Sequence, residues 1–156
     1  MNVSGNLAFS KNKVTGFTEY IDDYDLGGQK INHYKSTDIA FSPNAVGGAT
    51  INFLPCPKFE LSLLSKYVSK EYLDNTQNEK RRLNSFYTQD IRAIYTIKTK
   101  WFKEINITGQ VNNIFNKKYE PNGYTYSYIS GGETVTENYY FPMAGTNFII
   151  GVNVKL

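Results

Sequence analysis

The sequence predicts an all-β fold, an antiparallel meander of about six long strands that forms a single domain over residues 1–156. Two observations support this prediction. Apolar side chains occupy every second position in six separate stretches, and successive side chains of a strand point to opposite faces of the sheet. The connections between the stretches alternate between long and short, and the short ones can join only adjacent antiparallel strands.

The most regular alternation lies in residues 146–156. Its apolar row consists of Phe148, Ile150, Val152, Val154 and Leu156. Polar residues and one glycine fill the positions between them, with Ile149 the only exception. A tilted strand of roughly nine to eleven residues crosses the hydrocarbon layer of a bilayer, so this stretch is long enough to span one. A half-buried strand of a soluble β-sandwich alternates in the same way. The choice between a membrane-spanning strand and a sandwich strand therefore depends on the other stretches.

Five earlier stretches repeat the pattern. In chain order they cover residues 3–10, 45–53, 59–67, 87–97 and 105–112. The apolar positions that define them are Val3, Leu7 and Phe9, then Ala45, Ala49, Ile51 and Phe53, then Phe59, Leu61, Leu63 and Tyr67, then Tyr87, Ile91, Ala93, Tyr95 and Ile97, and finally Ile105, Ile107 and Val111. All these rows are expected on one face of a single sheet, because their members recur with a period of two and are separated mainly by polar residues.

The connections differ in length in a regular way. Residues 11–38, 73–84 and 120–145 form three long polar connections, for which no regular structure is expected, whereas residues 55–58 and 99–104 form two short turns. Short turns at one end and long loops at the other are typical of outer-membrane β-barrels. Strands of about ten residues also exceed the usual five or six of globular sheets. The pattern favours transmembrane β-strands in the outer membrane of a Gram-negative bacterium.

Aromatic residues gather near the ends of the expected strands. They are Tyr67, Tyr87, Trp101, Phe102, Phe115, Tyr119 and Phe141. Rings in these places are expected to form the aromatic girdles that mark the two membrane interfaces of a barrel.

Composition excludes several classes of protein. No run approaches the roughly 18 apolar residues of a membrane helix. The net charge of +3 comes without a stripe of Lys and Arg interleaved with aromatic rings, so no nucleic-acid partner is expected. His33 and Cys56 are the only residues of their types, so no cofactor, metal site, disulfide or catalytic triad is expected, and the protein is not expected to be an enzyme. The charge run at residues 79–82 is expected to be a solvated loop.

Polar residues between the apolar rows indicate a wide, water-filled or plugged lumen. The residues expected to face it are Lys66, Asp90, Arg92, Gln110 and Asn112. Asp90 and Arg92 share one face of a strand, and a cross-strand ion pair against a wall or plug is favoured over a substrate site. Six strands would leave two bare edges, which is costly in hydrocarbon, and residues 1–5 lack a secretory signal. We therefore expect this chain to be the end of a longer protein.

One segment resembles a known family. Residues 111–119 read VNNIFNKKY, which is similar to the V-x-N-L-F-N-x-x-Y segment of TonB-dependent outer-membrane receptors. As in that family, a loop and a terminal apolar strand follow. The segments LSKYV (residues 64–68) and YLDN (residues 72–75) resemble receptors of Bacteroides-like bacteria. One departure is Leu156, which stands where the family usually ends in Phe.

The resemblance implies that the chain contributes the last six strands of a 22-stranded barrel with an N-terminal plug. The implied function is active uptake of a scarce nutrient of the siderophore, cobalamin or glycan class. The implied partners are outer-membrane lipid, the missing N-terminal barrel and plug of the same receptor, the TonB system acting through that plug, and the small-molecule nutrient. Because the plug is absent, the chain is not expected to transport anything alone.

A tyrosine cluster is the best candidate for extracellular ligand contact, since tyrosine offers a flat ring and a hydroxyl. Its members are Tyr119, Tyr124, Tyr126, Tyr128, Tyr139 and Tyr140. The competing interpretation is that several of them belong to the outer girdle or pack the loop on itself. Two other functions stay open: a complete small outer-membrane barrel that is an adhesin or an enzyme, and a soluble β-sandwich binding module.

Overall fold

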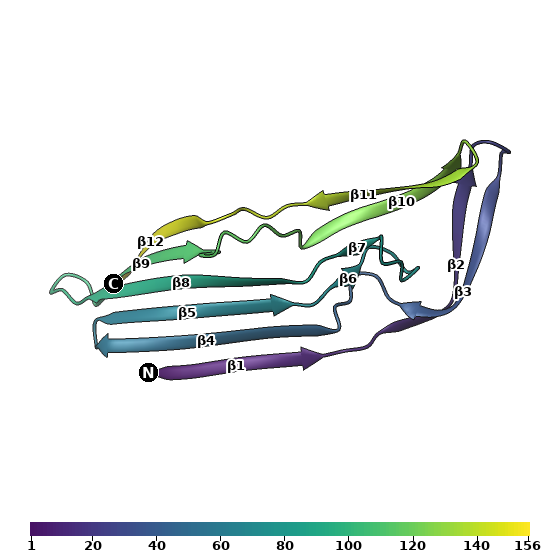
Figure 1. Ribbon diagram of the computed structural model, residues 1–156. Helices are drawn as coiled ribbons and strands as arrows, with labels where there is room; N and C mark the ends of the chain where they lie inside the picture. Colours follow the sequence, from purple (N-terminus) through teal and green to yellow (C-terminus); the bar gives the residue numbers. More distant parts are fainter.

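The computed structural model describes all 156 residues and contains twelve strands and no helix. Six long strands form one antiparallel sheet in the order β1-β4-β5-β8-β9-β12 (Figure 1). They are β1 (Asn2–Phe9), β4 (Ala45–Cys56), β5 (Phe59–Val68), β8 (Phe86–Ile97), β9 (Glu104–Asn112) and β12 (Asn147–Lys155). The predicted all-β meander of six strands is therefore confirmed. The sheet is open, because β1 and β12 each pair on one side only.

The register places the apolar rows on one face of this sheet. One row runs across all six strands, because each of its residues lies directly opposite the next: Val3, Ile51, Leu63, Ile91, Val111 and Phe148. Residues opposite each other in an antiparallel pair point to the same face. The prediction that the rows share one face is confirmed.

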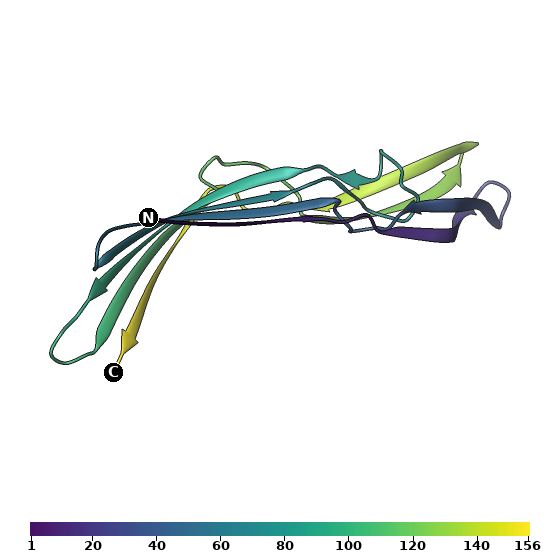
Figure 2. The ribbon, with the colours of Figure 1, turned by 90° about the horizontal axis from the view of Figure 1, so that it is seen from below.

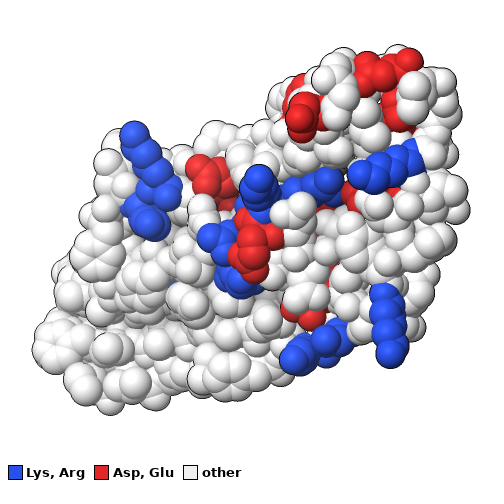
Figure 3. All heavy atoms as spheres, turned by 45° about the vertical axis from the view of Figure 1, so that its right-hand side comes forward, with Lys and Arg blue, Asp and Glu red and all other residues white.

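Neither face of the six-stranded sheet is covered by a second layer. Figure 2 shows a single twisted layer in which β1 and β12 diverge toward the short turns. The apolar row is consequently exposed: Phe148 is 76% and Ile150 73% accessible. Figure 3 shows a broad uncharged area on one side of the molecule, with the charged side chains concentrated toward the long connections. The sheet does not bury its own apolar surface.

The long connections are not irregular loops, so the expectation of no regular structure there was wrong. Residues 11–38 contain a hairpin of β2 (Lys13–Asp23) and β3 (Gln29–Asp38). Residues 120–145 contain a hairpin of β10 (Asn122–Ser130) and β11 (Glu133–Phe141). These strands pair with each other outside the main sheet, so they need no continuous apolar row and give a weaker hydrophobic pattern.

The two hairpins join in a second sheet of order β11-β10-β2-β3 at the end opposite the short turns (Figure 1). The middle connection, which joins β5 to β8 over residues 69–85, carries only a pair of two-residue strands, β6 (Glu71–Tyr72) and β7 (Arg82–Leu83). The small hydrophobic core lies where this connection meets the strand ends and the outer hairpins. Its buried residues are Ile21, Tyr72, Leu73, Leu83 and Phe86. The core therefore holds the outer hairpins to the main sheet.

The short turns have local explanations. Cys56 pairs with Phe59 across the first turn, and the register shifts between Phe53 and Cys56, where Pro55 interrupts the ladder. In the second turn the Thr99 hydroxyl oxygen accepts hydrogen bonds from the backbone N–H groups of Trp101 (3.2 Å) and Phe102 (2.9 Å). No helix in the structure is long and apolar enough to cross a membrane.

Candidate ligand-binding surface

The β10–β11 hairpin carries a ladder of tyrosine rings on one face. Tyr124 lies opposite Tyr139, and Tyr126 lies opposite Glu137. The rings of Tyr124 and Tyr139 stack with centroids 4.9 Å apart, Tyr126 stacks on Tyr139 at 6.1 Å, and Tyr128 follows Tyr126 at 6.1 Å. The alternation of side chains along β10 therefore converts a sequence of every-second tyrosines into one flat aromatic surface.

Glu137 fixes this ladder. Its carboxylate accepts hydrogen bonds from the hydroxyls of Tyr126 (2.8 Å), Tyr128 (3.1 Å) and Tyr139. These bonds, from Tyr139 first and then from Tyr126 and Tyr128, hold the pKa of Glu137 below its ordinary value. The same bond to Glu137 raises the pKa of the Tyr126 hydroxyl. The rings are thus held in place by a charged acceptor rather than by packing alone.

The tips of the two hairpins are tied together by Asp25. Its carboxylate oxygens accept hydrogen bonds from the backbone N–H groups of Gly131 (2.9 Å) and Gly132 (2.8 Å), which lower its pKa. Both glycines have positive φ angles, of 67° and 81°, a backbone conformation that glycine adopts without strain. Next to Asp25, the Tyr24 ring packs 5.6 Å from the Tyr128 ring and extends the aromatic surface onto the first hairpin.

A cleft separates β2 from β10. The two strands run parallel and pair only at Asp22 with Tyr128 and at Asp23 with Ile129. Away from these two positions they separate (Figure 1) and leave a cleft of about 420 Å³. Among the residues that line it are Tyr20, Tyr24, Tyr126 and Tyr128.

A buried arginine also lines this cleft. Arg81 is 5% exposed, and its Nη1 donates to Glu19 Oε1 at 2.6 Å and to Asp74 Oδ2 at 2.8 Å. Its Nη2 donates to the Ser127 hydroxyl of β10 at 2.6 Å. The expectation that residues 79–82 form a solvated loop is therefore wrong for Arg81, because burial between the two hairpins removes it from solvent.

The Glu19 carboxylate accepts hydrogen bonds from three side chains. Besides Arg81, it accepts hydrogen bonds from Asn32 Nδ2 at 3.0 Å and from the Tyr34 hydroxyl at 2.8 Å. Burial by itself would raise the pKa of Glu19, but these hydrogen bonds outweigh it and lower the pKa. Burial and the bond to Glu19 raise the pKa of Tyr34 to about 12. Glu19 therefore stays charged at neutral pH, and its network spans β2, β3, β10 and the middle connection.

Of the six tyrosines predicted to contact a ligand, the structure brings four together. Tyr119 lies apart from the ladder and stacks on Phe86 with centroids 4.3 Å apart. Tyr140 lies opposite Gly123, on the other face of the hairpin from the ladder, and its hydroxyl reaches the Arg82 carbonyl oxygen at 3.5 Å. The ladder consists of Tyr124, Tyr126, Tyr128 and Tyr139.

Sequence reasoning missed the residues that the first hairpin supplies. Tyr20, Tyr24 and Asp25 lie in a stretch expected to have no regular structure. The pair Gly27-Gly28 between two β-prone runs was a usable signal, since such pairs favour hairpin turns. No comparable signal marks Arg81, because its neighbour Arg82 is the same residue type and yet is only half-buried.

The five polar residues expected to face a lumen share the face opposite the apolar row. Arg92 lies opposite Gln110, and Lys66 lies opposite Thr88. The remaining two are Asp90 and Asn112. No ion pair joins Asp90 to Arg92. Asp90 Oδ1 instead accepts a hydrogen bond from the backbone N–H of Asn113 at 2.8 Å.

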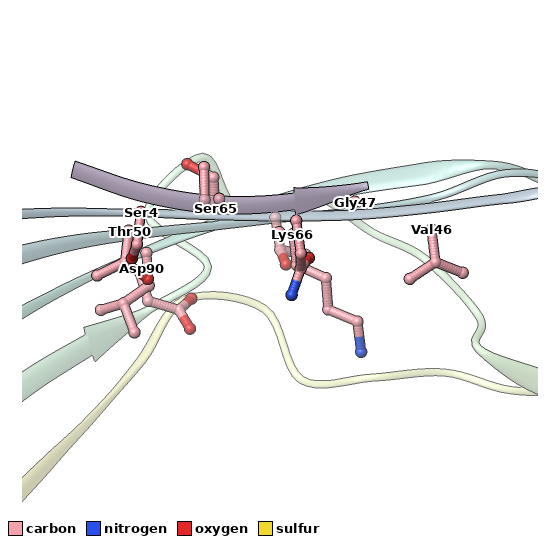
Figure 4. A pocket seen from close by; sticks show the side chains of 13 residues that line it. Ser4, Val46, Gly47, Thr50, Ser65, Lys66 and Asp90 are labelled. Carbon is pink, nitrogen blue, oxygen red and sulfur yellow. The ribbon is translucent and has the colours of Figure 1, made fainter. Parts of the chain in front are cut away.

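A polar hollow of about 550 Å³ lies on this face across β1, β4, β5 and β8. Figure 4 shows the side chains of Lys66, Asp90 and Val46 pointing to the same side of the sheet, with Ser65 on the other. Gly47 and Gly48 form part of its lining. No group of three or more His, Cys, Asp or Glu side chains is arranged to hold a metal ion.

Comparison with models of known protein families finds no match, and comparison with curated proteins finds none either. The chemistry that this surface can support is therefore inferred from its geometry alone. It offers stacked exposed rings, hydroxyls held by one carboxylate, and a cleft lined by a buried guanidinium.

Proposed function

We propose that the chain forms membrane-spanning strands of an outer-membrane receptor of the TonB-dependent class, which takes up a scarce nutrient. In this proposal the apolar face of the six-stranded sheet meets lipid and the polar face lines the lumen. The short turns lie in the periplasm and the hairpins β2–β3 and β10–β11 face the outside. The receptor is a transporter and not an enzyme.

The observation that carries the proposal is a pair of aromatic rows on the apolar face. Tyr67 lies opposite Tyr87 near the hairpin end, and Phe59 lies opposite Tyr95 near the short turns. The rows are eight positions apart on both strands, which is about 27 Å along a strand and roughly 20 Å along the membrane normal at the usual tilt. The apolar band of an outer-membrane barrel is about 25 Å tall and has such girdles at both borders.

The residues between the girdles support a lipid-facing role. Leu61 lies opposite Ala93 and Leu63 opposite Ile91, and no charged side chain shares their face between the aromatic rows. In a soluble sandwich such a face would be covered by a second sheet about 10 Å away. Here no second sheet covers it (Figure 2), and Leu61 (37%) and Ile91 (36%) are exposed between the aromatic rows.

The open edges of the sheet indicate the remaining partners. An unpaired backbone group in hydrocarbon costs several kcal/mol, so β1 and β12 need neighbouring strands within a membrane. In the proposed receptor these belong to the rest of a 22-stranded barrel. The plug inside that barrel would meet the polar face around Lys66 and Asp90 and would link the receptor to the TonB system.

Fractionation of cells that produce the whole receptor tests the proposal. The protein is expected in the outer-membrane fraction of a Gram-negative cell, and unheated samples are expected to migrate differently from boiled ones on a denaturing gel. Recovery of a detergent-free soluble monomer from the cytoplasm or periplasm would contradict the proposal and favour the sandwich alternative.

A further inference from the structure

The two short turns of the main sheet carry a cluster of lysines. One turn joins β4 to β5, and the other, residues 98–103, reads KTKWFK and joins β8 to β9. Both turns lie at the same end of the sheet (Figure 1). The first turn contacts the end of β8, because the backbone N–H of Thr96 donates to the Lys58 carbonyl oxygen at 2.8 Å. The four turn lysines are Lys58, Lys98, Lys100 and Lys103.

The turn lysines have no counter-charge within the protein. All four are exposed, and none of them forms an ion pair. The acidic residues nearest to them along the chain are Glu60 and Glu104, which lie on the polar face of the sheet. These two carboxylates accept hydrogen bonds from Ser62 and Asn106. The ammonium groups are therefore free to meet an anionic partner.

The opposite end of the molecule has a different balance of charge. Residues 10–44, 69–85 and 113–146 together contain ten Lys and Arg and eleven Asp and Glu side chains. All the ion pairs of the structure lie there, around Lys70, Arg81 and Arg82. The hairpin end is thus nearly neutral, whereas the two short turns carry positive charge only. An anionic partner is attracted to the short turns and not to the hairpins.

An exposed indole ring lies among the lysines. Trp101 is 89% exposed and its neighbour Phe102 is 37% exposed. The Thr99 hydroxyl accepts hydrogen bonds from the backbone N–H groups of both residues, which fixes the turn that presents the rings. Tryptophan is enriched at the headgroup level of a bilayer. Lysine suits the same level, because its apolar stem lies along apolar surface while its charged end stays in water.

The lysines begin where the apolar face of the sheet ends. Phe59 and Tyr95 form the aromatic row of that face nearest the short turns. Lys58 directly precedes Phe59, and Lys98 follows Tyr95 by three positions, which is about 10 Å along a strand. With the apolar face in lipid, the ammonium groups therefore lie at the depth of the lipid phosphates.

We propose that the turn lysines and Trp101 bind the phosphate headgroups of anionic phospholipid in the leaflet that the short turns face. The placement in a bilayer rests on the proposed function. The preference for anionic over zwitterionic headgroups rests on lysines without counter-charge, and roughly four to eight basic side chains at a membrane border are typical of anionic-lipid recognition. A soluble polyanion would account for the lysines but not for the exposed indole beside them.

The test measures which lipid surrounds the short turns of the intact receptor in a bilayer. A fluorophore is attached at Ile97→Cys, on the apolar face of β8, in a receptor that also carries Cys56→Ser. The bilayers are phosphatidylcholine with a small fraction of phosphatidylglycerol or phosphatidylcholine that carries a nitroxide on the same acyl position. Phosphatidylglycerol is expected to quench the fluorophore about threefold more strongly or better, since one lysine near the membrane surface changes lipid association by about fivefold.

Two changes are expected to remove this difference. Replacement of all four turn lysines by glutamine is expected to make the two lipids quench equally, and raising the salt from about 0.1 M to about 1 M is expected to reduce the difference. The matched control replaces four exposed lysines of the hairpin end by glutamine and is expected to preserve it. These are Lys13, Lys30, Lys35 and Lys80. Heat-modifiable migration of each variant shows that the barrel is folded.

Equal quenching of the unmodified receptor by the two lipids overturns the lipid site and leaves the proposed function intact, because the label still lies in lipid. A difference that survives the loss of the turn lysines, or that disappears equally in the matched control, has the same meaning. Equal quenching together with lysine-dependent binding of soluble polyphosphate assigns the lysines to a soluble polyanion instead. Quenching by neither lipid places residue 97 outside the bilayer and overturns the proposed function together with the lipid site.

Discussion

Arg81 Nη1 lies 2.6 Å from Glu19 Oε1, although the two residues are 62 positions apart in the chain, and both side chains are nearly buried at 6% and 11% exposure. The same guanidinium holds Asp74 and Ser127. Three long connections of the meander therefore meet at one side chain. We infer that they behave as one rigid unit and not as three independent loops.

Replacement of Arg81 is expected to loosen this unit. Arg81→Met leaves Glu19 and Asp74 without their partner, and removing one member of a buried pair typically costs about 3–5 kcal/mol. Hydrogen exchange over residues 13–38 and 122–141 is expected to accelerate, while β5 and β8 stay protected. Arg82→Met is the matched control, since the Arg82 side chain is 37% exposed and exposed pairs contribute about 0–1 kcal/mol. Equal effects of the two substitutions would contradict the role given to Arg81.

Acid is expected to weaken the same unit. The pKa of Glu19 is lowered in the folded protein, so its contribution is fully present above the ordinary value of 4.5 and is lost as the pH falls below it. Hydrogen exchange of β2 and β10, corrected for the intrinsic pH dependence, is expected to show less protection at pH 3 than at pH 6. Glu19→Gln is expected to reduce this difference, and Glu133→Gln, at an exposed position without an ion pair, is expected to preserve it. An unchanged pH response in Glu19→Gln would refute the assignment.

Gly123 is expected to tolerate no side chain. A Cβ atom at this position would lie 2.5 Å from the Tyr139 carbonyl oxygen and 3.2 Å from Leu73 Cδ2. Gly123→Ala is therefore expected to destabilise the β10–β11 hairpin by about 1–3 kcal/mol, as overpacking does. At Gly109 a Cβ atom meets nothing within 4 Å, so Gly109→Ala is expected to be neutral or slightly stabilising. Thermal unfolding of the two variants, combined with hydrogen exchange of residues 122–141, checks the contrast.

The open edges are expected to make the isolated chain self-associate. β1 and β12 expose unpaired backbone groups beside apolar side chains, and such edges pair with other chains. In detergent-free buffer, residues 1–156 are expected to sediment as oligomers or aggregates. Val3→Lys with Val152→Lys is expected to increase the monomer fraction, whereas Thr50→Lys with Thr88→Lys, on the inner strands β4 and β8, is expected to leave it unchanged. A stable monomer of the unmodified chain would show that the unpaired edges of β1 and β12 do not drive self-association.

The strands of the main sheet were predictable because their apolar side chains all have to lie on one face of the sheet. Residues such as Leu63, Ile91 and Val111 must all meet the same apolar environment, and a period of two records that demand in the sequence. The strands of the outer hairpins do not have to place all their apolar side chains on one face. In β3, the apolar residues Ile31 and Tyr34 fall on opposite faces, so the strand has no apolar row to detect.

The candidate site was predictable only in part for the same reason. Tyr124, Tyr126 and Tyr128 alternate along the chain, and the pair Gly131-Gly132 marks a hairpin turn. The tyrosine ladder could therefore be predicted from the sequence. The residues that contact these tyrosines from other segments could not be predicted from the sequence. Tyr20 and Arg81 reach the cleft through contacts between segments far apart in the chain, which composition and periodicity do not encode.

The central claim is that one face of the six-stranded sheet meets lipid and the other meets water. Spin labels placed singly at residues 104–112 of β9, in the membrane-embedded receptor with Cys56→Ser, test it most directly. Collision rates with oxygen, which concentrates in lipid, are expected to peak at Ile105, Ile107, Gly109 and Val111. Rates with a water-soluble nickel complex are expected to peak at the positions between them. Equal access of the nickel complex to both sets, or the opposite alternation, would contradict the account.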